Sequence, residues 1–131
     1  MKELTKAEDQ VMQILWKLKK AFVNDIIDQI PEPKPAYNTV STIVRILEKK
    51  GFVFYNAYGK SHQYYPLVEK TVYSDFYLKS MITSYFGGSF DNLVSFFAKE
   101  NQLDIKDIDA LMKHVKGEIK TEDQWVISSF I

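Results

Sequence analysis

Three stretches in the first part of the chain place apolar side chains at the three- and four-residue spacing of an amphipathic helix. The first starts at residues 5–8, Thr-Lys-Ala-Glu, which have the spacing of a capping box. The second covers residues 23–30. The prolines of residues 31–35 end it, because proline lacks an amide hydrogen and restricts the residue before it. The third covers residues 37–50 and stops at Gly51, where a helix-terminating glycine is expected.

A hairpin is predicted directly after these helices. Residues 52–58 and 62–65 are rich in aromatic and β-branched side chains, and Gly59-Lys60-Ser61 between them is typical of a hairpin tip. Residues 21–23 are also apolar and could supply a short strand or a hydrophobic staple. Helix, helix, proline turn, helix and hairpin is the order of elements in a winged helix-turn-helix.

The second half of the chain returns to helical spacing. One helix is predicted around residues 72–85 and ends at Gly87-Gly88, and two more are capped by Ser89 and Asp104. Three short helices bury too small a fraction of their surface to be stable alone, so we expect a second copy of the chain to cover their apolar faces. The residues expected at or near that homodimer contact are Phe76, Leu93, Phe97, Leu111 and Val115.

The predicted fold class is therefore mostly α with a small β wing. A winged-helix DNA-binding domain is expected over residues 1–67, followed by a C-terminal helical dimerisation domain with a tail over residues 68–131. The role of the apolar tail, residues 121–131, stays open.

Charge is distributed unevenly although the net charge is zero. Residues 1–66 contain ten Lys and Arg against seven Asp and Glu, a net charge of +3, and residues 67–131 contain seven against ten, a net charge of −3. Within residues 34–63 the single acid is Glu48, and the basic residues are Lys34, Arg45, Lys49, Lys50 and Lys60. This polarity favours a DNA-facing first half.

Several classes of protein are disfavoured. The absence of cysteine excludes disulfides and thiolate metal sites and indicates a reducing, cytoplasmic setting. No signal-peptide core is present, and no stretch approaches the ~20 apolar residues that span a bilayer, so we expect no direct membrane insertion. His62 and His114 lie far apart in the sequence, and no catalytic set or phosphate loop can be named. We therefore expect no metal, no cofactor and no enzyme activity.

The outward face of the third predicted helix carries the functional prediction. Asn38, Ser41, Thr42, Arg45 and Lys49 fall on one stripe without an acid. Small polar side chains near the start of such a helix can meet base edges in a major groove, and basic side chains further along can neutralise phosphate. A solvated helix face is the alternative explanation. The residues expected to contact DNA are Tyr37, Asn38, Thr39, Ser41, Thr42, Arg45, Lys49, Lys50, Tyr58, Lys60, Ser61 and His62.

Motifs in both halves of the chain match one known family in the same order. They are Leu4-Thr5-Lys6-Ala7-Glu8, Val11-Met12, Ile14-Leu15-Trp16, Tyr37-Asn38-Thr39-Val40-Ser41-Thr42, Leu47-Glu48-Lys49-Lys50-Gly51-Phe52, Tyr64-Tyr65-Pro66-Leu67, Phe86-Gly87-Gly88-Ser89 and Leu93-Val94. Over about residues 4–120 the chain resembles the penicillinase and methicillin-resistance repressor family, the BlaI/MecI type of winged-helix transcriptional repressor.

The resemblance implies repression of resistance-type genes and control by a membrane-bound metalloprotease sensor. Asn38 and Ser41 stand where members usually carry Lys or Arg, which leaves the operator sequence open. Cleavage in the family falls in the helix that here holds Phe96 and Phe97, and Phe96 stands where the best-matched members have asparagine. Copper-responsive relatives bind metal through C-terminal cysteines, which this chain lacks.

The resulting hypothesis is a sequence-specific DNA-binding repressor that acts as a homodimer on a pseudo-palindromic operator and is relieved by proteolysis. The alternative is a winged-helix protein-interaction module that does not read DNA sequence. Salt separates the two, because binding to duplex DNA weakens steeply as salt rises.

Overall fold

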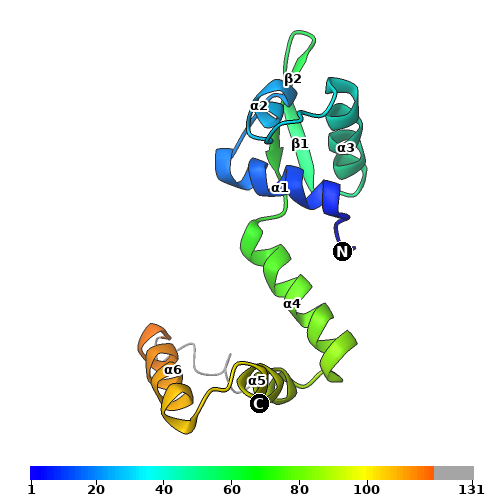
Figure 1. Cartoon of the computed structure of the whole chain (residues 1–131). Helices are drawn as coiled ribbons and strands as arrows, with labels where there is room; N and C mark the ends of the chain where they lie inside the picture. The colour runs from blue at the N-terminus through cyan, green and yellow to red at the C-terminus, as the bar shows by residue number, and fades with distance from the viewer. Residues whose placement is uncertain (120–131) are drawn as a thin grey trace. The chain divides into compact units, whose positions relative to one another are not determined.

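The computed structural model describes residues 1–119, which form six helices and one hairpin (Figure 1). Contacts divide the chain into a first unit, Met1–Tyr77, and a second unit that begins at Leu78. The predicted fold class is confirmed, since the described residues are mostly helical with a two-stranded antiparallel wing. In chain order the elements are α1 (Lys6–Leu18), α2 (Val23–Asp28), α3 (Tyr37–Lys49), β1 (Val53–Tyr58), β2 (Ser61–Pro66), α4 (Lys70–Phe86), α5 (Phe90–Glu100) and α6 (Ile105–Glu118).

The core of the first unit lies between the apolar faces of α1, α2 and α3 and the base of the hairpin. These faces exist because the buried residues recur at three- and four-residue spacing along each helix. Each fully buried aliphatic side chain contributes about 1.5–3 kcal/mol relative to exposure. The largest side chains with less than 2% exposure are Val11, Met12, Leu15, Ile26, Val40, Val44, Leu47, Phe52 and Val53.

The predicted capping box at the start of α1 is confirmed. The Thr5 amide donates to Glu8 Oε1 at 2.9 Å, and the Glu8 amide donates to Thr5 Oγ1 at 3.2 Å. The Glu8 side chain also accepts from Lys50 Nζ at 2.9 and 2.8 Å, and Glu8 is only 4% exposed. This ion pair therefore joins the start of α1 to the end of α3. Gly51 follows with a φ of +81°, a left-handed conformation that suits glycine at a helix end.

The hairpin has the predicted position and tip. Tyr55 faces Tyr64 in the register, and Gly59 at the tip has a φ of +62°. Ala21 adds a short bridge: its amide donates to the Tyr64 carbonyl at 2.9 Å, and the Tyr64 amide donates back at 2.8 Å. The predicted short strand around residues 21–23 is thus present as an isolated bridge that holds the wing against the loop between α1 and α2.

The first turns of α4 pack on the first unit. Tyr73 is buried there, its hydroxyl accepts from the Leu4 amide at 2.9 Å, and its ring lies 5.8 Å from that of Phe52. Trp16 Nε1 donates to the Val68 carbonyl at 2.9 Å. Phe76, which we expected at or near a dimer contact, packs against this same core. The winged-helix unit therefore includes the start of α4.

The helices of the second unit have the end residues that the sequence predicts. Gly87 and Gly88 have positive φ after α4, Ser89 Oγ accepts from the Asn92 amide at 3.2 Å, and Asp104 Oδ1 accepts from the Asp107 amide at 2.9 Å. Ile82, with 5% exposure, is the one buried residue among the described residues from 78 to 119. The apolar predicted tail, residues 121–131, lies outside the described residues.

Candidate nucleic-acid interface

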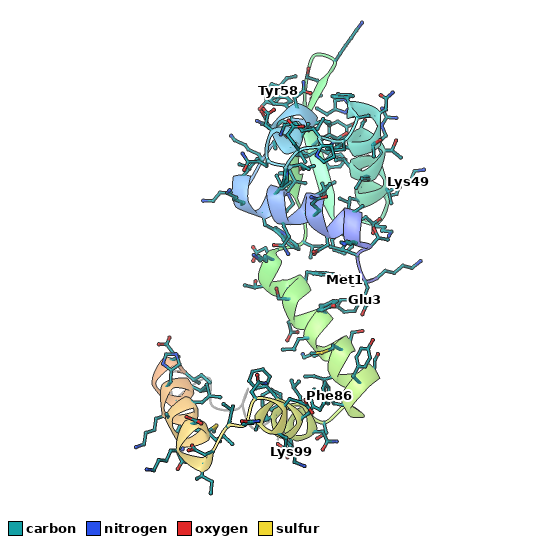
Figure 2. The ribbon with its side chains drawn as sticks, viewed as in Figure 1. Met1, Glu3, Lys49, Tyr58, Phe86 and Lys99 are labelled. Atoms are coloured by element: carbon teal, nitrogen blue, oxygen red, sulfur yellow. The ribbon has the colours of Figure 1, made fainter. Side chains whose placement is uncertain are left out.

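The polar face of α3 is turned away from the core. Val40, Val44 and Leu47 are buried and hold the helix against the rest of the first unit. On the other side Tyr37, Asn38, Thr39, Thr42, Arg45 and Lys49 are exposed, and Ser41 is half-buried. Figure 2 shows Lys49 projecting outward from the C-terminal end of α3. One helix therefore combines a buried apolar stripe with an exposed stripe that has donors, acceptors and positive charge.

The start of α3 leaves amides available for an anionic ligand. Its N-cap residue is Ala36, which makes no side-chain cap hydrogen bond. The Thr39 and Val40 amides turn back to the Ala36 carbonyl at 3.1 and 3.3 Å. The other amides of the first turn, those of Tyr37 and Asn38, point along the axis toward solvent by helix geometry, where they favour negative charge.

Thr42 has its hydroxyl hydrogen directed into the helix. Thr42 Oγ1 donates to the Asn38 carbonyl at 2.8 Å. The hydroxyl oxygen can still accept a hydrogen bond, and the γ-methyl group can contact the methyl group of a thymine. Thr42 is therefore suited to accept from a base or to make an apolar contact in this rotamer, and not to donate.

The basic residues of α3 fall into two groups. Arg45 and Lys49 are exposed on the outward face. Lys50, which we expected to contact DNA, bonds to Glu8 with its ammonium, and its side chain is 28% exposed. Burial opposes ionisation of Glu8, but hydrogen bonds from Lys50 and Thr5 outweigh that cost and lower the pKa of its carboxyl. The charge of Lys50 therefore stabilises the first unit through its ion pair with Glu8.

The wing presents a small cationic tip. Tyr58 is 58% exposed (Figure 2). Lys60 and Ser61, which follow it in the sequence, are also exposed. His62 is half-buried because its ring stacks on Tyr55 with centroids 3.9 Å apart. Below the stack, burial and then the charge of Glu48 raise the pKa of the Tyr64 hydroxyl. The aromatic stack therefore packs the side chains of the two strands against each other below the tip of the wing.

An open hollow of about 480 Å³ lies between the starts of α2 and α3 and the wing tip. Five predicted DNA-contacting residues line it: Tyr37, Tyr58, Lys60, Ser61 and His62. Phe22, Val23, Asn24 and Asp25 complete the lining, and the Phe22 ring packs edge-on against Tyr58 at 6.0 Å. The sequence prediction did not include these four residues in the site, because apolar residues 21–23 suggested only a strand or staple. Residues at the start of α2 therefore line the same hollow as the wing tip and the start of α3.

The residues predicted for dimerisation and cleavage lie on several helices. Phe96 and Phe97 are exposed on α5, and the Phe96 ring lies 5.5 Å from that of Phe86 at the end of α4. Leu93 on α5 and Val115 on α6 are half-buried, whereas Leu111 on α6 is exposed.

The described residues offer neither a metal site nor a membrane-spanning helix. Within residues 1–119, no group of three or more His, Cys, Asp or Glu side chains is placed to hold a metal ion. Among the described helices, none is both long enough and apolar enough to cross a membrane.

Comparison with known proteins identifies the family. Residues 4–117 match the penicillinase repressor family. The methicillin resistance regulatory protein MecI of Staphylococcus aureus is 34% identical over 110 residues, which is 83% of this chain and 89% of the relative. The penicillinase repressor of Bacillus licheniformis is 24% identical over 83% of this chain and 86% of its own. A solved structure titled CopR repressor is 35% identical and covers 52% of this chain and 100% of its own, with a TM-score of 0.43. The chain therefore belongs to the penicillinase repressor family of DNA-binding transcriptional repressors.

Proposed function

We propose that this repressor binds a pseudo-palindromic operator as a homodimer, with α3 in the major groove. The observation that carries the proposal is the acid-free exposed face of α3 beside the cationic wing tip. Asn38, Ser41 and Thr42 would meet base edges because they lie near the helix start. Arg45 and Lys49 would contact phosphates and position the helix without reading sequence.

The wing would contact the neighbouring backbone. Lys60 is the cationic group at the hairpin tip, and Tyr58 and Ser61 supply hydroxyls beside it. His62 would act from the stacked position on Tyr55. Lys50 is left out of the proposed contact, because moving its ammonium to a phosphate would leave the buried Glu8 carboxylate unpaired.

The second unit would supply the dimer contact. Several large apolar side chains in its described residues are exposed, including Tyr85, Phe96, Phe97 and Leu111. Pairing with a second copy would cover this surface and set two recognition helices about 34 Å apart, one turn of duplex. We assign Leu93, Phe97, Leu111 and Val115 to the contact. Phe76 is omitted because it packs in the first unit.

Relief of repression would come from cleavage in α5. The Phe96 and Phe97 side chains are exposed, so a protease could engage them once this helix unwinds locally. The proposed agent is a membrane-bound metalloprotease sensor, which the family resemblance of the sequence implies. Resistance-type genes are the proposed targets, in keeping with the names of the relatives.

The first test is selection of bound duplexes from a random library, followed by footprinting at several salt concentrations. We expect a two-fold symmetric sequence with half-sites about one helical turn apart, and binding that weakens steeply with salt. A protein-interaction module would select no common sequence. Incubation with membranes that contain the sensor should then give a cut after Phe96, and an uncut chain would remove the proteolytic step from the proposal.

A further inference from the structure

Lys34 lies in the turn that connects α2 to α3. Its side-chain ammonium donates to three backbone carbonyls: Ile27 at 3.0 Å, Asp28 at 3.3 Å and Ile30 at 2.7 Å. An ammonium has three hydrogens to donate, so these carbonyls match its full capacity. Ile27 and Asp28 are the last two residues of α2, where the helix dipole favours a cation, and Ile30 directly follows the C-cap residue.

The sequence of the turn explains why a side chain donates these hydrogen bonds in place of a backbone amide. The Gln29 amide donates to the Ile26 carbonyl and the Ile30 amide donates to the Ile27 carbonyl. The next residue in this series is Pro31, which has no amide hydrogen to give to the Asp28 carbonyl. Lys34 Nζ supplies that missing donor.

The prolines also restrict where the lysine can point. Pro33 and Pro35 flank Lys34, and a following proline holds the preceding residue in extended backbone. The side chain therefore starts from a restricted conformation and loses less freedom when it reaches back to α2. The recognition helix begins at Tyr37, three residues later.

We propose that Lys34 is a positioning residue for DNA recognition, because its ammonium ties the end of α2 to the chain that enters α3. This inference rests on the proposed function of α3. Lys34 raises operator affinity without touching DNA, since its charge is directed at carbonyls and not at phosphates. The two roles differ in salt dependence, because each phosphate contact adds about one unit to the salt slope.

The test compares Lys34→Met, Lys34→Arg and a control, Lys20→Met, which removes the same charge from an exposed lysine after α1. Operator and random duplexes are titrated at several salt concentrations, well below the unfolding temperature. We expect Lys34→Met to bind the operator about tenfold more weakly, with less loss on random duplex and an unchanged salt slope. Lys34→Arg, which keeps the cation, should recover most of the affinity, and Lys20→Met should match the parent.

Two results would overturn the proposal. Unchanged operator affinity in Lys34→Met would show that the contact does not position α3, and a salt slope smaller by about one unit would make Lys34 a phosphate contact. A second measurement on the unmodified chain applies even where Lys34→Met fails to fold. In the NMR spectrum, the ammonium hydrogens of Lys34 should be protected from exchange with water. Rapid exchange would contradict the hydrogen bonds from Lys34 to the three carbonyls. If the unmodified chain binds no duplex, the proposed function fails. The exchange measurement still tests the hydrogen bonds of Lys34 independently.

Discussion

The two compact units use their apolar side chains in different ways. In the first unit, the apolar faces of α1, α2 and α3 meet one another and the hairpin, so a continuous core forms within one chain. In the described part of the second unit, Ile82 is buried, whereas Tyr85 is 78% exposed and Phe97 is 57% exposed. The first unit therefore has the features of an independently folding domain. The second has exposed apolar surface of the kind that marks protein–protein interfaces.

This difference suits a division of labour in a repressor. A rigid first unit can hold α3 and the wing tip in a fixed relation, because every element that carries them packs on one core. A second unit with exposed apolar faces can associate, and pairing two weak half-site readers raises affinity through effective concentration.

The largest expected effect comes from separating the units. A chain that ends at Tyr77 keeps the whole first-unit core, including Tyr73, and should fold as a monomer. Its affinity for a full operator should fall by about 10²–10⁴, because the second half-site no longer binds intramolecularly. Sedimentation and DNA titration measure both properties. A truncated chain that still dimerises would place the contact in the first unit.

A charge on the apolar surface of α5 should weaken the dimer next most strongly. Phe97→Asp removes a large exposed ring and adds a charge that resists burial, so we expect a loss of about 2–4 kcal/mol in dimerisation free energy. Ser95→Asp, at an exposed polar position of the same helix, is the matched control. Sedimentation equilibrium gives both values, and equal dimerisation of the two variants would exclude Phe97 from the contact.

Loss of the Glu8–Lys50 pair should instead weaken the first unit. Glu8→Gln leaves the Lys50 ammonium without its carboxylate partner, so unfolding should be easier by about 1–3 kcal/mol. The exposed Glu100 offers the control Glu100→Gln. Chemical denaturation of the full chain measures both variants under the same conditions, and equal losses would mean that the Glu8–Lys50 pair adds no stability.

The same pair predicts a dependence on pH. Because the folded-state pKa of Glu8 lies below its ordinary value of 4.5, the stabilisation is complete above that value. It is lost as pH falls through the lower folded-state pKa, when the carboxyl becomes protonated. Chemical denaturation at several pH values should therefore show a smaller fall in the free energy of unfolding at acid pH for Glu8→Gln than for the parent. An equal fall would mean that other carboxylates dominate the loss.

Base reading is expected to be separable from dimerisation. Thr42→Ala removes the methyl group and the acceptor that face outward from α3, so discrimination at one base pair should fall by about 1 kcal/mol. The dimerisation constant should not change. Thr71→Ala, at an exposed position on α4, provides the control, and a footprint with unchanged preference would remove Thr42 from the reading face.

The wing tip should show the smallest effect. Lys60→Ala should weaken operator and random duplex alike and reduce the salt slope by about one unit, because one phosphate contact is lost. The exposed Lys20, changed to Ala, controls for a general loss of charge. A slope equal to that of the parent would mean that Lys60 does not contact phosphate.

Local sequence was sufficient to predict most elements. The caps at Thr5, Ser89 and Asp104 were predicted correctly, because a cap depends on residues only three positions apart. The hairpin and the ends of α3 and α4 also follow from short-range rules, since glycine adopts positive φ where other residues are strained.

Tertiary structure decided what the individual side chains do. Lys34 and Lys50 were both counted as part of a basic DNA-facing segment, yet the ammonium of Lys50 binds Glu8, 42 residues away, and that of Lys34 binds the end of α2. Phe76 packs in the first unit because Tyr73 holds the start of α4 there. Helical spacing gives the face on which a residue lies, but the partner across that face depends on how distant segments pack, and no local pattern contains that information.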